Sequence, residues 1–285
     1  LTEAYVESGQ KLDFGRFDTP PVASLFVVGV GDKVSLIVCP MVAAAGASVP
    51  ELSGRGLGHT GGTIDKLESI PGIKANLSPK RCFKILKDVG VFIAAQSRSI
   101  VPADQKIYAI RNVTATVDSI PLIVASIISK KLAVGAKSLV LDIKFGNGAF
   151  MKTARMSRRL GRSLVEVANH YGLNTAAILT DMNQPLGYAV GNALEVKEAI
   201  EYLRGDKRAK DLNTIVISLG AIMLRLSGVA DSLIEGKRML KETLNSGTAI
   251  ETLRKMIAAQ EGDVRVIYDT SILPHAPVVK KLLAS

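Results

Sequence analysis

Residues 53 to 68 read Ser53-Gly-Arg-Gly-Leu-Gly-His-Thr-Gly-Gly-Thr-Ile-Asp-Lys-Leu-Glu68, with five glycines inside nine consecutive positions. Glycine tolerates positive φ and lets the backbone approach a ligand closely. The residues that follow read as a helix start, where unpaired N–H groups and the helix dipole favour an anion. Thr60, Thr63 and Ser53 add hydroxyls, and Arg55 adds a planar cation. The stretch predicts an anion-binding loop, with a tight turn as the alternative, and it lacks the Gly-Lys-Ser/Thr ending of a Walker A loop.

The composition indicates a globular chain with a sizeable core. It has 285 residues, of which 47% are hydrophobic, and this length allows one large domain or two small ones. There is no Trp and only 5% aromatic residues, which argues against stacking platforms for single-stranded nucleic acid. A net charge of +10 suits anionic small molecules. Because the basic clusters are short and scattered, we interpret them as solvated faces and expect no nucleic-acid partner.

The cysteines, histidines and apolar runs each exclude a class of site. Cys39 and Cys82 form no CxxC motif, which fits reduced thiols in a cytoplasmic protein. The three histidines have no metal-ligand spacing, so we expect no metal. The longest apolar run, residues 36–47, is too short to cross a membrane. The chain begins Leu-Thr-Glu without an initiator Met or a signal peptide, and we expect a fragment of a longer protein.

Strands and helices are predicted to alternate along the chain. A helix end is expected in residues 1–12, and mainly helical structure over the last seventy residues. Strands are predicted at residues 22–28, 49–52, 90–95, 136–143 and 175–179. Helices are predicted at residues 34–45, 78–89, 154–171, 193–204 and 212–226. Helical signals also dominate residues 104–131, where a helix with Pro121 in its first turn is predicted to follow an earlier helical piece that carries Arg111. This order predicts an α/β fold with a largely parallel sheet.

A second glycine turn and a set of cations complete the candidate site. The turn Gly29-Val-Gly-Asp-Lys33 precedes a helix with Ser35 in its first turn, so two loops at helix starts are predicted to line one pocket. Ser126 and Lys130 are four residues apart on one helix face, and an exposed helix face is the alternative interpretation. There is no nucleophile with an adjacent base. The residues alone leave phosphotransfer, glycosyl transfer and simple anion binding open.

Long motifs in the chain resemble the thymidine and pyrimidine-nucleoside phosphorylases. The resemblance is carried by residues 53–72, by Tyr108-Ala-Ile-Arg-Asn-Val-Thr-Ala-Thr-Val-Asp-Ser-Ile-Pro-Leu122, by Ser126-Ile-Ile-Ser-Lys-Lys131, and by Gln184-Pro-Leu-Gly-Tyr-Ala-Val-Gly-Asn-Ala-Leu-Glu195. It covers nearly the whole chain. Members of this family cleave a pyrimidine nucleoside with phosphate, giving the free base and (deoxy)ribose 1-phosphate.

The resemblance implies an architecture and an assembly. It implies a large α/β domain with a central, mostly parallel (mixed) sheet, formed by residues 20–100 and 135–285. A small all-helical domain, incomplete here, would comprise residues 1–15 and 103–134. Relatives are longer at both ends and are homodimers that pair through the small domain. Inorganic phosphate is the co-substrate, and no cofactor is expected.

The resemblance also assigns roles to individual side chains. Three hydroxyls match phosphate-contacting positions: Ser35, Ser53 and Thr63. Four residues match positions that bind the base: Tyr108, Arg111, Ser126 and Lys130. The base leaves with negative charge, which two cations would stabilise. Positioning and charge stabilisation would carry the reaction without a covalent enzyme intermediate.

One stretch departs from the family pattern Asp-Lys-His-Ser-Thr-Gly-Gly-Val-Gly-Asp-Lys. Here residues 23–33 read Ala-Ser-Leu-Phe-Val-Val-Gly-Val-Gly-Asp-Lys. Ser24 replaces a phosphate-binding Lys, Leu25 a base-contacting His, Phe26 a phosphate-contacting Ser, and Val28 a Gly. Since one lost transition-state donor costs on the order of 10²–10³ in rate, these changes together predict nearly abolished phosphorolysis. Either the chain is a degenerate relative, or its coding sequence contains a compensated frame slip.

Two further functions stay open at this stage. One is a non-catalytic pyrimidine or nucleoside-binding protein that keeps Arg111, Ser126 and Lys130. The other is a glycosyltransferase of the anthranilate phosphoribosyltransferase type, which shares a glycine phosphate turn. The complete motif over residues 53–72 argues against the latter.

Overall fold

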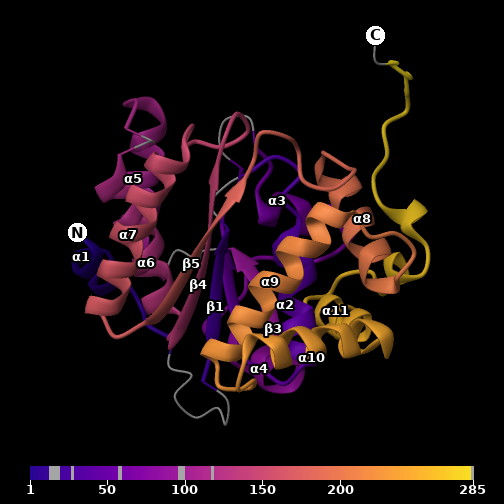
Figure 1. The fold of residues 1–285 in the computed structure, drawn as a ribbon, viewed down its shortest axis with the longest axis horizontal. Helices are drawn as coiled ribbons and strands as arrows, with labels where there is room; N and C mark the ends of the chain where they lie inside the picture. Colours follow the sequence, from indigo (N-terminus) through magenta and orange to yellow (C-terminus); the bar gives the residue numbers. More distant parts are fainter. Residues whose placement is uncertain (13–19, 27–28, 57–59, 96–99, 117–118, 284–285) are drawn as a thin grey trace.

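The computed structural model describes residues 1–12, 20–26, 29–56, 60–95, 100–116 and 119–283. Strands occupy the middle of the molecule, with one group of helices on each side (Figure 1). Helices α7 and α9 both contact the central strands, each from its own side. The fold is therefore a layered α/β arrangement, as the alternation in the sequence predicts.

The described strands form two parallel ladders. They are β1 (Val22–Phe26), β2 (Val49–Ser53), β3 (Val91–Ala95), β4 (Ser138–Phe145) and β5 (Asn174–Asp181). One ladder has the order β1-β4-β5, and β2 pairs with β3 in the other. The Val22 N–H donates to the Ser48 carbonyl at 2.9 Å, which links the start of β1 to the residue before β2. Because all described pairings are parallel, the carboxyl ends of the strands in each ladder lie at a common edge.

The helices on the two sides differ in their partners. On one side lie α1 (Thr2–Glu7), α5 (Pro102–Val113), α6 (Ile120–Ala133) and α7 (Ala154–His170). The remaining helices are α2 (Val34–Ala44), α3 (Thr63–Leu67), α4 (Pro79–Val89), α8 (Asn192–Arg204), α9 (Lys210–Leu226), α10 (Leu233–Asn245) and α11 (Thr248–Ala259), with short 3-10 turns at Val264–Ile267 and Thr270–Ile272. Helix α1 packs on α5 and α6. Helices α1, α5 and α6 come from the segments assigned to a small helical domain, whereas α7 comes from the segment assigned to the α/β domain, and the domain boundaries remain a prediction.

Local sequence signals explain several helix ends. Ser78 caps α4, because its Oγ accepts from the Arg81 N–H at 3.3 Å and Pro79 occupies the first turn. Gly90 ends α4 with φ of 84°, a left-handed conformation that favours glycine. Thr153 caps α7 through the Met156 N–H. These caps set helix bounds within one or two residues of the predicted ones.

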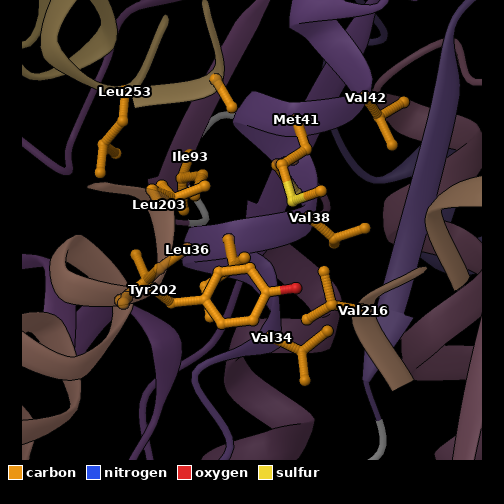
Figure 2. Packing of buried hydrophobic residues seen from close by; sticks show 14 of the residues in the cluster. Val34, Leu36, Val38, Met41, Val42, Ile93, Tyr202, Leu203, Val216 and Leu253 are labelled. Atoms are coloured by element: carbon orange, nitrogen blue, oxygen red, sulfur yellow. The ribbon is translucent and has the colours of Figure 1, made fainter. Parts of the chain in front are cut away.

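The apolar run at residues 36–47 forms most of α2, the central helix of the core. Val34, Leu36, Val38 and Met41 are buried among side chains from other elements, including Tyr202 (Figure 2). The burial of residues all round this helix explains why the run lacks an amphipathic pattern. Within the described part of the chain, no helix combines the length and the apolar character needed to cross a membrane.

Candidate active site

A cavity of about 500 Å³ lies where several parallel strands end. It is lined by residues that end or follow four strands and by residues of α5, α6 and α7: Gly29, Asp32, Glu51, Leu52, Ser53, Gly54, Arg55, Gly61, Gly62, Thr63, Ile64, Asn76, Ala95, Gln105, Tyr108, Arg111, Ile123, Ser126, Ile127, Lys130, Phe150, Met151 and Leu160. The carboxyl edge of a parallel sheet is the usual position of a ligand site in α/β proteins. Residues of both glycine turns line this one cavity, although no described residue in the first turn of α2, which follows the turn at residues 29–33, does so.

Helices α5 and α6 bring together the four residues predicted to bind the base. Tyr108 and Arg111 come from α5, and Ser126 and Lys130 come from α6. Arg111 is 5% exposed, Ser126 3% and Lys130 8%. The alternative of an exposed helix face for Ser126 and Lys130 is therefore wrong. We call these four residues the α5–α6 end of the cavity.

The Lys130 ammonium at the α5–α6 end makes two side-chain hydrogen bonds. Its Nζ donates to Ser126 Oγ at 2.7 Å and to Asp104 Oδ2 at 2.9 Å. Burial lowers the pKa of Lys130, and the Asp104 carboxylate only partly opposes this effect. Asp104 was missed by sequence reasoning, although its place in the first turn of α5 could have suggested a helix-capping role.

Tyr108 lies between the two cations of this end. The Arg111 Cζ is 5.8 Å and the Lys130 Nζ 5.9 Å from the centre of the Tyr108 ring, which are cation–π distances. Burial raises the pKa of Tyr108 to about 12, so its hydroxyl stays protonated at neutral pH. Arg111 also donates from Nε to the Thr116 carbonyl at 3.3 Å. The group can therefore offer a positive, aromatic and hydrogen-bonding surface to a planar ligand.

Another part of the cavity lining holds two of the three predicted phosphate contacts. Ser53 ends β2, and Thr63 begins α3, and both line the cavity. Ser35 is buried in the first turn of α2 and is not among the described residues that line it. We call the part formed by Ser53, Thr63 and the two glycine turns the β2–α3 end.

Two backbone amides of the glycine-rich loop bind a carboxylate of the same chain, that of Asp65. Asp65 Oδ2 accepts from the Gly56 N–H at 2.7 Å and from the Gly62 N–H at 3.2 Å. A Cβ on Gly62 would lie 2.2 Å from the Gly56 nitrogen, so this loop needs glycine for its own packing. The loop thus has features of both predictions. It is a tight turn, and two of its N–H groups bind an anion, but that anion is the Asp65 carboxylate and not a ligand.

The cations of the two glycine turns, Arg55 and Lys33, are already engaged by carboxylates. Arg55 lines the cavity, but its Nη1 binds Asp65 at 2.9 Å and Glu68 at 2.7 Å. Lys33 is fully buried, and its Nζ binds Glu198 at 2.7 Å and the Leu186 carbonyl at 2.8 Å. Neither side chain extends a free charge toward a ligand in this arrangement.

The first glycine turn places a carboxylate at the cavity wall. Burial would raise the pKa of Asp32, but the Lys144 and Lys66 ammonium groups outweigh this effect and hold it below its ordinary value. Lys144 Nζ lies 2.9 Å from Asp32 Oδ2 and also contacts Asp142. Lys66 Nζ donates to the Asp32 carbonyl at 2.6 Å and pairs with Glu195 at 2.9 Å. This turn is therefore fixed by buried ion pairs that the sequence did not reveal.

The divergent stretch can be followed only in part. Ser24 is buried in β1, and its N–H and Oγ both donate to Glu51 Oε2, at 3.1 and 3.0 Å. The backbones of Leu25 and Phe26 pair with Leu141 and Asp142 of β4. Val28 lies outside the described residues. Among the residues that are described, no group of three or more His, Cys, Asp or Glu side chains could hold a metal ion.

Comparison with known proteins identifies the lineage. The profile of the glycosyl transferase family, a/b domain, matches residues 28–250. The chain is 52% identical over 280 residues to a thymidine phosphorylase of Sinorhizobium fredii, covering 98% of this chain and 64% of that protein. It is 45% identical over 284 residues to a pyrimidine-nucleoside phosphorylase of Geobacillus stearothermophilus, covering 100% of this chain and 65% of that protein. The chain thus spans just under two thirds of the length of these curated relatives.

Solved structures agree on the fold. An anthranilate phosphoribosyltransferase of Thermus thermophilus superposes with a TM-score of 0.68 at 17% identity, covering 91% of this chain and 83% of that one. The corresponding protein of Saccharomyces cerevisiae, in complex with PRPP and Mg, gives 0.65 at 13% identity and covers 90% of this chain and 78% of that one. These likenesses concern the fold alone. Because the profile matches most of its length, the chain belongs to the glycosyl transferase family, and residues 28–250 form the a/b domain of that family.

Proposed function

We propose that the chain is the nucleoside-binding and phosphate-binding part of a pyrimidine-nucleoside phosphorylase. Its reaction is thymidine or uridine plus phosphate, giving the free base and (deoxy)ribose 1-phosphate. The observation that carries this proposal is the single cavity shared by Tyr108, Arg111, Ser126 and Lys130 at one end and by Ser53 and Thr63 at the other. The names of the relatives at 45–52% identity support the same reaction class.

The chemistry follows from the charges at the α5–α6 end. When the glycosidic bond breaks, negative charge develops on the pyrimidine ring. Arg111 and Lys130 lie within reach of a ring placed beside Tyr108, and both are buried, so their attraction for that charge is weakly screened by water. The phosphate bound near Ser53 and Thr63 attacks C1′ of the oxocarbenium-like sugar. No side chain needs to form a covalent bond with the substrate.

We propose that this form of the protein turns over slowly. The Lys, His and Ser expected at positions 24, 25 and 26 are replaced by Ser24, Leu25 and Phe26, and Ser24 is bound to Glu51. The direct test is the phosphate-dependent release of thymine or uracil. The wild-type rate should be low, and the combined variant Ser24→Lys, Leu25→His, Phe26→Ser, Val28→Gly should raise it. No release by the combined variant, even when it is made in the full-length protein, would overturn the proposed reaction. Sequencing the gene across these codons would test the frame-slip hypothesis.

A non-catalytic pyrimidine-binding protein is the second candidate. It is favoured by the two carboxylates, Asp32 and Glu51, that line the cavity near the predicted phosphate position. Calorimetry with uridine, in the presence and absence of phosphate, separates the two functions. Uridine binding that phosphate strengthens, even slightly, supports the phosphorylase, whereas binding that is indifferent to phosphate supports the second candidate; the size of the enhancement in the wild type bears on Glu51 and not on the choice between these functions. The anthranilate phosphoribosyltransferase type remains an alternative only at the level of fold.

The assembly and setting of the full-length protein also belong to this proposal. We expect a homodimer that pairs through the small helical domain, a cytoplasmic location, and inorganic phosphate as co-substrate without a cofactor. Size-exclusion chromatography with light scattering of the full-length protein would check the dimer. Activity that survives exhaustive dialysis against a chelator would check the last expectation.

A further inference from the structure

Glu51 occupies an unusual position for an acidic residue. It lies in the middle of β2, is 1% exposed, and lines the cavity beside Ser53. Its carboxylate accepts four hydrogen bonds: Oε2 from the Ser24 N–H and Oγ, and Oε1 from Lys131 Nζ and Ser53 Oγ. These four donors suit an acceptor-only group, and the Glu51 carboxylate pairs with the Lys131 ammonium at 2.8 Å in the wall of the β2–α3 end.

Glu51 engages one hydroxyl that lines the cavity, that of Ser53, and one ammonium group that is not among the lining residues, that of Lys131. Lys131 is fully buried and places its Nζ 2.8 Å from Glu51 Oε1 and 3.2 Å from the Leu52 carbonyl. The Ser53 hydroxyl donates to the same Oε1 at 3.3 Å. The phosphate-contacting hydroxyl and the nearby ammonium therefore share one internal acceptor.

Three other cations around this end also form ion pairs with carboxylates. Lys144 is held by Asp32 and Asp142, Lys66 by Glu195, and Arg55 by Asp65 and Glu68. Asp32 adds a second carboxylate to the lining. An entering phosphate would thus meet two carboxylates at low exposure, each already paired with an ammonium group, Glu51 with Lys131 and Asp32 with Lys144, and no ammonium group of these pairs is left over to attract it.

We propose that Glu51 is a specificity-determining residue that weakens phosphate binding at the β2–α3 end. It does so by placing a negative charge in the wall and by holding the Lys131 ammonium and the Ser53 hydroxyl. The cavity consequently accepts a neutral nucleoside more readily than a phosphate dianion. This inference rests on the proposed function, because Ser53 and Thr63 are taken there as the phosphate contacts.

Calorimetric titration with inorganic phosphate tests the proposal on four proteins. They are the wild type, Glu51→Gln, Lys131→Met and the combined variant Glu51→Gln/Lys131→Met. Glutamine keeps the size and an acceptor oxygen while removing the charge. Glu51→Gln should bind phosphate about tenfold more tightly than the wild type, the worth of one charge-assisted hydrogen bond. Lys131→Met should bind more weakly than the wild type, and the combined variant should return close to it.

A second comparison keeps the proposal falsifiable if Glu51→Gln does not fold, since removing one member of a buried ion pair is destabilising. The combined variant carries no unpaired charge at this pair, and it should bind phosphate about tenfold more tightly than Lys131→Met alone. Equal phosphate affinity within each pair of proteins would overturn the role of Glu51. Titration with uridine is the parallel readout: no uridine binding by the wild type would contradict the proposed function, while the order of phosphate affinities would still decide the role of Glu51.

Discussion

The two ends of the cavity are built from similar residues but differ in how their charges are used. At the α5–α6 end, Lys130 and Arg111 lie near the Tyr108 ring and line the cavity, and Lys130 has one carboxylate partner, Asp104. At the β2–α3 end, Arg55 also lines the cavity, yet it is bound to Asp65 and Glu68. A motif of positive and hydroxyl residues therefore does not by itself define an anion site. The partners of each charge decide whether a ligand can use it.

The largest effect is expected when the cation of the buried Glu51–Lys131 pair at the β2–α3 end is removed. Lys131→Met leaves Glu51 as a buried carboxylate without its cation, which should lower the free energy of unfolding by about 3–5 kcal/mol. Urea denaturation measures this effect. The matched control is Lys84→Met, which removes an exposed i,i+4 pair with Asp88 and should cost at most about 1 kcal/mol. Equal effects of the two substitutions would contradict the account of the buried pair.

The second prediction removes the charge at the α5–α6 end. Lys130→Met should lower the rate of phosphate-dependent thymine release by on the order of 10²–10³, because Lys130 stabilises the charge on the departing base. The rate is measured under single-turnover conditions with enzyme in excess. Lys106→Met, on the exposed face of α5, should leave the rate unchanged. An unaltered rate in Lys130→Met would exclude Lys130 from the reaction.

The third prediction concerns the anion held by the glycine-rich loop. Asp65→Ala removes the acceptor of the Gly56 and Gly62 N–H groups and one partner of Arg55. As a lost helix N-terminal contact, it should lower the free energy of unfolding by about 1 kcal/mol. It should also strengthen phosphate binding, because two amides become available, while Glu68 still holds the Arg55 guanidinium. Phosphate binding that weakens would show that Asp65 organises the loop for the ligand instead of competing with it.

The smallest effect sharpens the description of the α5–α6 end. Ser126→Ala deletes the 2.7 Å contact to Lys130 Nζ but leaves the Asp104 contact in place. The dissociation constant for uridine should rise about fivefold, corresponding to roughly 1 kcal/mol. Ser126→Thr retains a hydroxyl and should recover most of the affinity. If Ser126→Ala weakened uridine binding as much as Lys130→Met does, Ser126 would contribute more than its hydrogen bond to Lys130, which would indicate a direct contact with the ligand.

Periodicity and turn residues were sufficient to predict most of the fold. The strand over residues 90–95 and the helix over residues 78–89 appear as β3 and α4, because a Ser-Pro start and a Gly stop act locally. The alternation of strands and helices predicted the parallel arrangement. The separation of the described strands into two ladders was not predicted, since strand order depends on contacts between distant segments.

The candidate site was predictable where one helix face carries it, and much less so where distant charges meet. Ser126 and Lys130 share a face at four-residue spacing, so their proximity follows from helix geometry. The contact of Glu51 with Lys131 joins residues eighty positions apart, and no local pattern indicates it. For the same reason Arg55 was expected to serve a ligand, although Asp65 and Glu68 bind it. Ser35 was predicted from resemblance at the phosphate position but does not line the described cavity.

The most direct test of the account is a calorimetric titration of the wild-type protein with uridine, repeated in saturating phosphate. The account predicts that uridine binds through the α5–α6 end, that Lys130→Met abolishes this binding, and that phosphate strengthens it only slightly until the charge of Glu51 is removed. Strong enhancement by phosphate in the wild type, or uridine binding that survives Lys130→Met unchanged, would contradict the contrast between the two ends.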